Sequence, residues 1–210
     1  MIFFIFGCST TAQTYMNAGL AEYGSGNIGV ASSISASSAV FVALGSVVMP
    51  MLIAKCKKLR PVMFILCLAQ CLTMALIFVL PFGAATLGLF FFMGLFLGAM
   101  LAMGKTIPAL LPNIDPRNLG AVGGIQSTFQ NVGAWIVAGY IIAPISQSLL
   151  PGNIYFGIYI LSGVFALLAG ITILLLPEMP TSVDAKIRLD AEKAAAANAS
   201  YGLRGAAGLS

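Results

Sequence analysis

The sequence contains very little charge. Only 8% of its 210 residues are Asp, Glu, Lys or Arg, whereas 60% are hydrophobic. A typical soluble domain has about 25% charged residues, so this chain has too few polar side chains to cover a water-facing surface. The composition indicates an all-α membrane protein that crosses the bilayer several times, and it excludes an ordinary soluble domain.

Several kinds of functional residue are also absent. The chain has no histidine, so no imidazole is available as a general base, a metal ligand or a pH-sensitive group. It has no phosphate-binding loop, no metal-ligand cluster and no nucleophile beside a base. We therefore expect no enzyme activity, no catalytic residue, no metal and no cofactor. The pI is near 9.0, but the basic residues lie only beside apolar segments, so we expect no nucleic acid partner.

The hydrophobic residues are grouped in six segments of roughly 20 residues, the length of helix that crosses about 30 Å of hydrocarbon. Short stretches rich in Gly, Pro and Asn separate them. Together the segments predict a six-helix transmembrane domain over residues 1–178. The predicted spans are about 2–21, 28–53, 61–80, 85–104, 119–147 and 154–176.

The basic residues predict an orientation in the membrane. All ten lie in the loops after the second and fourth predicted spans or in the tail, and none lies in the other three loops. Loops rich in Lys and Arg stay in the cytoplasm. We therefore expect a multi-pass protein of the cell (plasma or inner) membrane, with both termini cytoplasmic. The strongest anchor is the loop that contains Lys55, Lys57, Lys58 and Arg60.

Residues 179–210 differ from the predicted spans. They mix acidic and basic side chains with a run of alanines and a glycine- and serine-containing end. We predict a cytoplasmic tail that begins with a short helix and is otherwise largely flexible.

Charge is also missing from the middle of every predicted span. The fourth span is predicted to end at residue 104, just before Lys105, so no fixed charge or proton relay is expected within the bilayer. Glu22 is interpreted as a solvated loop charge rather than as a proton site. The pair Gly94 and Gly98, four residues apart, predicts close helix packing rather than a specific dimer motif.

Most of the amides that fall inside predicted spans lie in the first and fifth spans. Gln13 and Asn17 lie on one face of the first, and Gln126 and Gln130 on one face of the fifth. Amides in hydrocarbon need partners, so they either join helices or line a water-filled cavity, and the sequence leaves both open. The same choice applies to the serines of the second span, Ser32, Ser33, Ser35, Ser37 and Ser38.

The chain resembles the C-terminal half of a major facilitator superfamily transporter. Two stretches are similar to that family, in addition to the six spans with a polar, glycine-rich fifth. The loop 52–58 keeps the basic character of the family's loop motif, with Ala54 at the position of its Asp and Lys57 at that of its Gly. Residues 108–125 are similar to the junction of the family's tenth and eleventh helices.

This resemblance implies a fold and a mechanism. The fold is one half of a twelve-helix transporter, built as two three-helix inverted repeats around a midplane site. The first and fourth spans would line a cavity, the second and fifth would gate it, and the third and sixth would be peripheral. The chain would be part of a symporter or antiporter that moves a small solute by alternating access. The candidate solute-binding residues are Gln13, Tyr15, Asn17, Gln126, Gln130, Asn131 and Trp135.

The resemblance also implies a partner in the lipid bilayer. The chain is expected to be a fragment that works with a missing N-terminal six-helix half, or with a second copy of itself. The alternative from another functional class is a non-transporting six-helix membrane scaffold or assembly protein.

Overall fold

The computed structural model describes residues 1–23, 28–56, 58–81, 83–110, 116–181, 186–188 and 191–192. In this part of the chain the fold is all helical, with seven α-helices and no strand. This confirms the predicted all-α class. The helices are α1 (Ile2–Tyr23), α2 (Ile28–Ile53), α3 (Leu59–Ile77), α4 (Ala84–Leu110), α5 (Leu119–Ile136), α6 (Ala143–Leu149) and α7 (Ile154–Leu174).

Two shorter helical pieces flank α5. A 3₁₀ turn, η1 (Pro116–Asn118), precedes it, and a π-helical segment, η2 (Val137–Ile142), joins it to α6. As a result α5, η2 and α6 form one continuous rod, Leu119–Leu149.

Within the described residues, five helical segments are long and apolar enough to cross a membrane. They are Gly29–Ile53, Leu59–Ile77, Ala84–Leu110, Leu119–Leu149 and Ile154–Leu174. Helix α1 has 22 residues and is long enough, but its amides and threonines make it less apolar than these five. These five helices fit a multi-pass membrane protein, and α1 falls short of the same apolar character.

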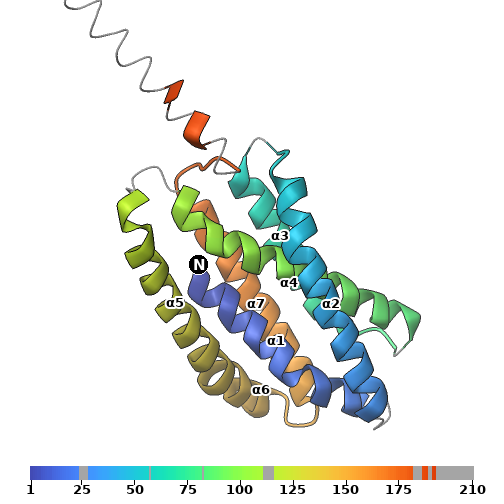
Figure 1. Cartoon of the computed structure of the whole chain (residues 1–210). Helices are drawn as coiled ribbons and strands as arrows, with labels where there is room; N and C mark the ends of the chain where they lie inside the picture. The colour runs from blue at the N-terminus through green and yellow to red at the C-terminus, as the bar shows by residue number, and fades with distance from the viewer. Residues whose placement is uncertain are drawn as a thin grey trace, which may run out of the picture.

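The helices are arranged around α1 and α4. Helix α1 packs against α2, α5 and α7, and α4 packs against α2, α3 and α5. In Figure 1, α1 and α4 run through the middle of the view, with α5 on the left and α2 on the right. Helices α3 and α7 pack against each other and lie partly behind the others. This leaves α1 and α4 at the centre of one face of the bundle.

Glycines bring α2 and α4 into backbone contact. A Cβ added to Gly98 would collide with the carbonyl oxygen of Val42, and one added to Gly45 would collide with that of Leu95. Gly94 is equally closed, since a Cβ there would lie 2.8 Å from a backbone oxygen of α2. The predicted close packing through Gly94 and Gly98 is confirmed, and the partner is α2.

A second glycine crossing joins α1 to the rod. A Cβ on Gly133 would lie 2.5 Å from the carbonyl oxygen of Phe3, and one on Gly7 would lie 2.6 Å from the Cβ of Val137. At the far end of the rod, the Ser146 hydroxyl donates a hydrogen bond to the carbonyl of Ile154 at the start of α7. The rod is thus held at its middle by α1 and at its end by α7.

The loops rich in basic residues meet at one end of the bundle. Arg60 donates a hydrogen bond to the carbonyl of Leu174 and lies 3.9 Å from the Glu178 carboxylate. The Thr181 hydroxyl donates to the carbonyl of Cys56 at 2.9 Å. Lys186 donates to the carbonyl of Ala109 near the end of α4, also at 2.9 Å. The loop after α2, the end of α4 and the residues after α7 therefore share one end.

The fourth helix is longer than the sequence predicts. Helix α4 continues to Leu110, past the predicted end at residue 104, because Ile107 and Leu110 are buried in the core beyond Lys105. Most of the predicted tail, 179–210, lies outside the described residues, as does Lys57.

Candidate functional site

A groove between α4 and α5 collects several polar side chains. Its cavity volume is about 450 Å³. Helix α4 contributes one cation and α5 contributes a polar stripe. We call it the basic groove, and its lining residues are Lys105, Gly123, Gln126, Ser127, Gln130 and Asn131. Three of the predicted site residues, Gln126, Gln130 and Asn131, are therefore brought together here.

The stripe follows from helical spacing. Residues 123, 126, 127, 130 and 131 recur at three- and four-residue intervals, which places them on one face of α5. Gly123 lies at one end of this face, where a Cβ would meet nothing within 4 Å. The glycine at this position therefore keeps the groove open, unlike Gly133, which lies at a crossing.

The amides of the stripe differ in how they are used. Gln126 donates a hydrogen bond from Nε2 to the carbonyl oxygen of Gly104, at 3.1 Å, and so joins α5 to α4. For this residue the helix-joining interpretation is confirmed. The side chains of Gln130 and Asn131 make no hydrogen bond to any described residue, so their donors and acceptors are available to a bound molecule.

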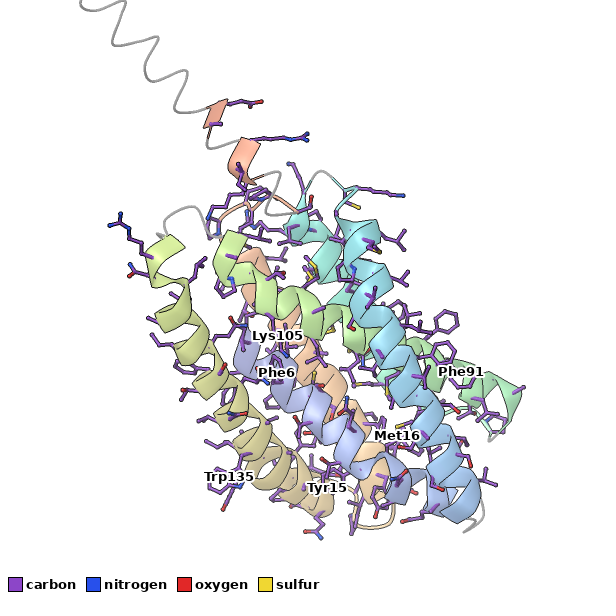
Figure 2. The ribbon with its side chains drawn as sticks, in the orientation of Figure 1. Phe6, Tyr15, Met16, Phe91, Lys105 and Trp135 are labelled. Carbon is purple, nitrogen blue, oxygen red and sulfur yellow. The ribbon has the colours of Figure 1, made fainter. Side chains whose placement is uncertain are left out.

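Lys105 was missed as a site residue. The sequence-based boundary placed it after the fourth span, but it lies inside α4, on the wall of the basic groove. Its Nζ is 6.0 Å from the centroid of the Phe6 ring of α1, and Figure 2 shows the two residues beside each other. Lys105 lies in the last third of α4, so the middle of this helix is free of charge, as the sequence predicts. The apolar residues Ile107, Ala109 and Leu110 after Lys105 were the signal that the helix continues.

Gln13 lies in a different groove, between α1, α2 and α4. This serine groove has a volume of about 350 Å³ and no charged lining residue. Its lining residues are Gln13, Met16, Ser35, Ser38, Ala39, Val42, Met93 and Leu97.

The other three predicted site residues line neither groove. Asn17 is exposed on α1. Tyr15 is half-buried against a core cluster that includes Met16 and Leu20. Trp135 is 66% exposed and its ring contacts Tyr140 edge-on, with centroids 5.0 Å apart. Trp135 lies on the rod, and Figure 2 shows it well away from Lys105, toward the opposite end of the bundle.

A third groove, of about 540 Å³, includes the acidic residue Glu22. It is lined by the ends of α1 and α3 and the start of α7. Besides Glu22, its lining residues are Gly19, Tyr23, Phe78, Val79, Asn153, Tyr155 and Phe156. The sequence pointed to Glu22 but not to this groove, because Phe78, Val79 and residues 153–156 come from segments far from α1 in the chain.

Comparisons with protein-family models, curated proteins and solved structures found no match for this chain.

Proposed function

We propose that this chain is the C-terminal six-helix half of a major facilitator superfamily secondary transporter, which moves a small solute by alternating access. The observation behind the proposal is the polar, hollowed face of an otherwise apolar bundle. Helices α1 and α4 lie at the centre of this face, and the basic and serine grooves lie along it. Polar side chains without partners are costly in lipid, so this face must meet water or another protein.

The helix pairings support two repeated three-helix units. If α1 is exchanged with α4, α2 with α5 and α3 with α7, the pairs α1–α2, α2–α4 and α1–α7 become α4–α5, α5–α1 and α4–α3. All of these pairs are in contact, and the α3–α7 and α1–α4 contacts map onto themselves. The contacts of α7 with α6 and η2 are the exceptions. Inverted repeats produce such a pattern.

The two glycine crossings support the same exchange. The α2–α4 crossing uses Gly45 against Leu95, and the α5–α1 crossing uses Gly133 against Phe3. In this scheme α1 is the sixth span. Its lower hydropathy follows from amides that face the solute path instead of lipid.

A second six-helix unit would cover the polar face. The partner in this proposal is an N-terminal half or a second copy of the chain, and lipid surrounds the rest. Exposed apolar residues on α2 and α5, such as Val47, Met51 and Phe129, suit contact with lipid or with that partner.

Orientation is tested with the exposed native Cys56, which lies in the basic loop. The proposal places both termini and this loop in the cytoplasm, and Gly152 on the other side. A thiol placed at Gly152 should react with an impermeant reagent added outside intact cells, whereas Cys56 should react only after permeabilisation. The reverse pattern would contradict the orientation.

Alternating access is tested with Ser127→Cys in the full-length protein, after Cys56 is replaced by Ser. Ser127 lies in the basic groove, so its thiol should react with impermeant reagents from either side of the membrane. Phe129→Cys is the matched control, because Phe129 is exposed on the same helix outside the groove lining and should react slowly. A non-transporting scaffold, the rival suggested by the Gln126–Gly104 hydrogen bond, predicts reaction of Ser127→Cys from one side at most.

A further inference from the structure

We infer that the solute is a small anion with a single carboxylate, and that Lys105 is its counter-charge in the basic groove. This inference rests on the proposed function and names the substrate class of the same site. It depends on four observations: the depth of Lys105, the absence of a partner charge, the polar side chains opposite it, and the contrast with the other grooves.

Lys105 lies within the helix and not in a loop. It is five residues before Leu110, the last residue of α4, which is roughly 8 Å along the axis at 1.5 Å per residue. A lysine near a helix end can extend its ammonium toward the aqueous phase. Here, however, Lys105 lines the groove and approaches Phe6 of α1. At 6.0 Å the Phe6 ring is at the limit of cation–π range, so it leaves the ammonium available.

No acidic residue balances this charge in the described part of the chain. The lining of the basic groove contains no Asp or Glu, and the ion pair of the basic end uses Arg60 and Glu178. Lys105 is exposed in the single chain. Once the proposed second unit covers the groove, its ammonium would be stabilised by an opposite charge nearby. A bound anion would supply it, whereas a cation would be repelled.

The opposite wall offers hydrogen-bond donors and acceptors. The free amides of Gln130 and Asn131 can donate to a carboxylate and accept from a hydroxyl or amine of the same solute. Gln126 is already bonded to Gly104 and acts as a positioning residue. The groove has one lysine and no arginine. A lysine acts as a point charge without the two-pronged geometry that arginine offers to phosphate, so one charge on the protein favours one charge on the solute.

The other grooves differ in charge. The serine groove has none, and the third groove has Glu22, which would disfavour an anion. Among these grooves, the basic groove is therefore the one suited to a carboxylate.

The experiment measures protection of Ser127→Cys from a thiol reagent in the full-length protein. Glycolate and acetate are the single-carboxylate probes, and acetamide is the neutral match for acetate. Methylammonium is the cation, and inorganic phosphate is the anion of higher charge. Three versions of the Ser127→Cys protein are compared: one keeps Lys105, one has Lys105→Gln and one has Lys105→Arg. Each rate of thiol labelling is divided by the rate for the same variant without probe.

We expect the carboxylates to protect the wild-type background and, more weakly, Lys105→Arg. In Lys105→Gln the concentration for half-protection should rise roughly tenfold or more, because a hydrogen bond to a charged group is lost. Acetamide and methylammonium should not protect. Protection that is equal for acetamide, retained in Lys105→Gln, equal for inorganic phosphate, or absent for both carboxylates would overturn the inference.

Two failures are distinguishable. If Ser127→Cys does not react from both sides of the membrane, the proposed function fails. If it does react from both sides, in the Lys105 variants as well, but carboxylates give no charge-dependent protection, only the anion assignment fails.

Discussion

The basic groove and the serine groove occupy related places but have different chemistry. One lies beside the α4–α5 pair and the other beside α1–α2, which correspond in the exchange described above. In the serine groove, the Ser38 hydroxyl donates to the Phe90 carbonyl of α4 at 3.5 Å. Elsewhere on α2, the Ser33 and Ser37 hydroxyls donate to carbonyls of their own helix, at 2.9 Å each. The amide groups of Gln130 and Asn131 make no such bond. A short hydroxyl can bond to a carbonyl of its own helix or of the helix packed against it, whereas these longer amides are left for a bound molecule.

The comparison teaches that polar content alone does not make a site. Serines give the second span many polar atoms, but several of these are already bonded locally. The α5 stripe has fewer polar residues, but those that are unbonded face a cation.

The largest effect is expected at the crossing beside the serine groove. Gly98→Ala places a methyl group against the backbone carbonyl of Val42, which has no side-chain rotamer to yield. We expect destabilisation of about 3 kcal/mol, the upper end of typical overpacking. Thermal unfolding and the yield of monodisperse protein measure it. Gly88→Ala is the control on the same helix, since a Cβ there meets nothing within 4 Å. Equal behaviour of the two variants would contradict the backbone contact.

The next effect separates the amides of the two grooves. Gln126→Ala removes the hydrogen bond to Gly104 that joins α5 to α4, which should cost about 1 kcal/mol of stability. Gln13→Ala removes an exposed side chain and should change stability by less than about 0.5 kcal/mol. Urea or thermal unfolding of both variants makes the comparison. A larger loss for Gln13→Ala would reverse the assignment of roles.

A functional effect is expected within the stripe. Gln130→Ala should weaken apparent solute affinity by roughly three- to tenfold, the loss of about one hydrogen bond, and should leave the melting temperature unchanged. Asn17→Ala removes an exposed side chain of α1 that lies outside both grooves, so it should have a smaller effect on affinity. Protection of Ser127→Cys by glycolate measures both. If Gln130→Ala instead loses stability and keeps affinity, its amide joins helices as Gln126 does.

The smallest effect is expected for the serines. Ser37→Ala removes a hydroxyl that bonds only to the Ser33 carbonyl of its own helix, so stability and solute affinity should both change by less than about 0.5 kcal/mol. Thermal unfolding measures the stability, and protection of Ser127→Cys by glycolate measures the affinity. A marked loss of affinity would show that the α2 serines take part in binding.

Hydropathy predicted the order and rough bounds of the helices because apolar length alone decides which segments can cross a bilayer. It failed at Lys105, since a boundary drawn at the first charged residue cannot anticipate that Ile107 and Leu110 remain buried in the core. Spacing correctly placed Gln126 and Gln130 on one face. It could not show that Gln13 faces a different groove, because that depends on which helices are neighbours.

The π-helical segment η2 has a consequence for the whole rod. It lies between the stripe that lines the basic groove and the end that Ser146 attaches to α7. π-Helical turns are rare, and they change the register of everything that follows. The helical register of the rod therefore differs on the two sides of η2: one register places the stripe at the groove, and the other places Ser146 at α7. Deleting one residue from Val137–Ile142 would turn the anchor by about 100° relative to the stripe, whereas substitutions in the stripe leave the anchor's register intact.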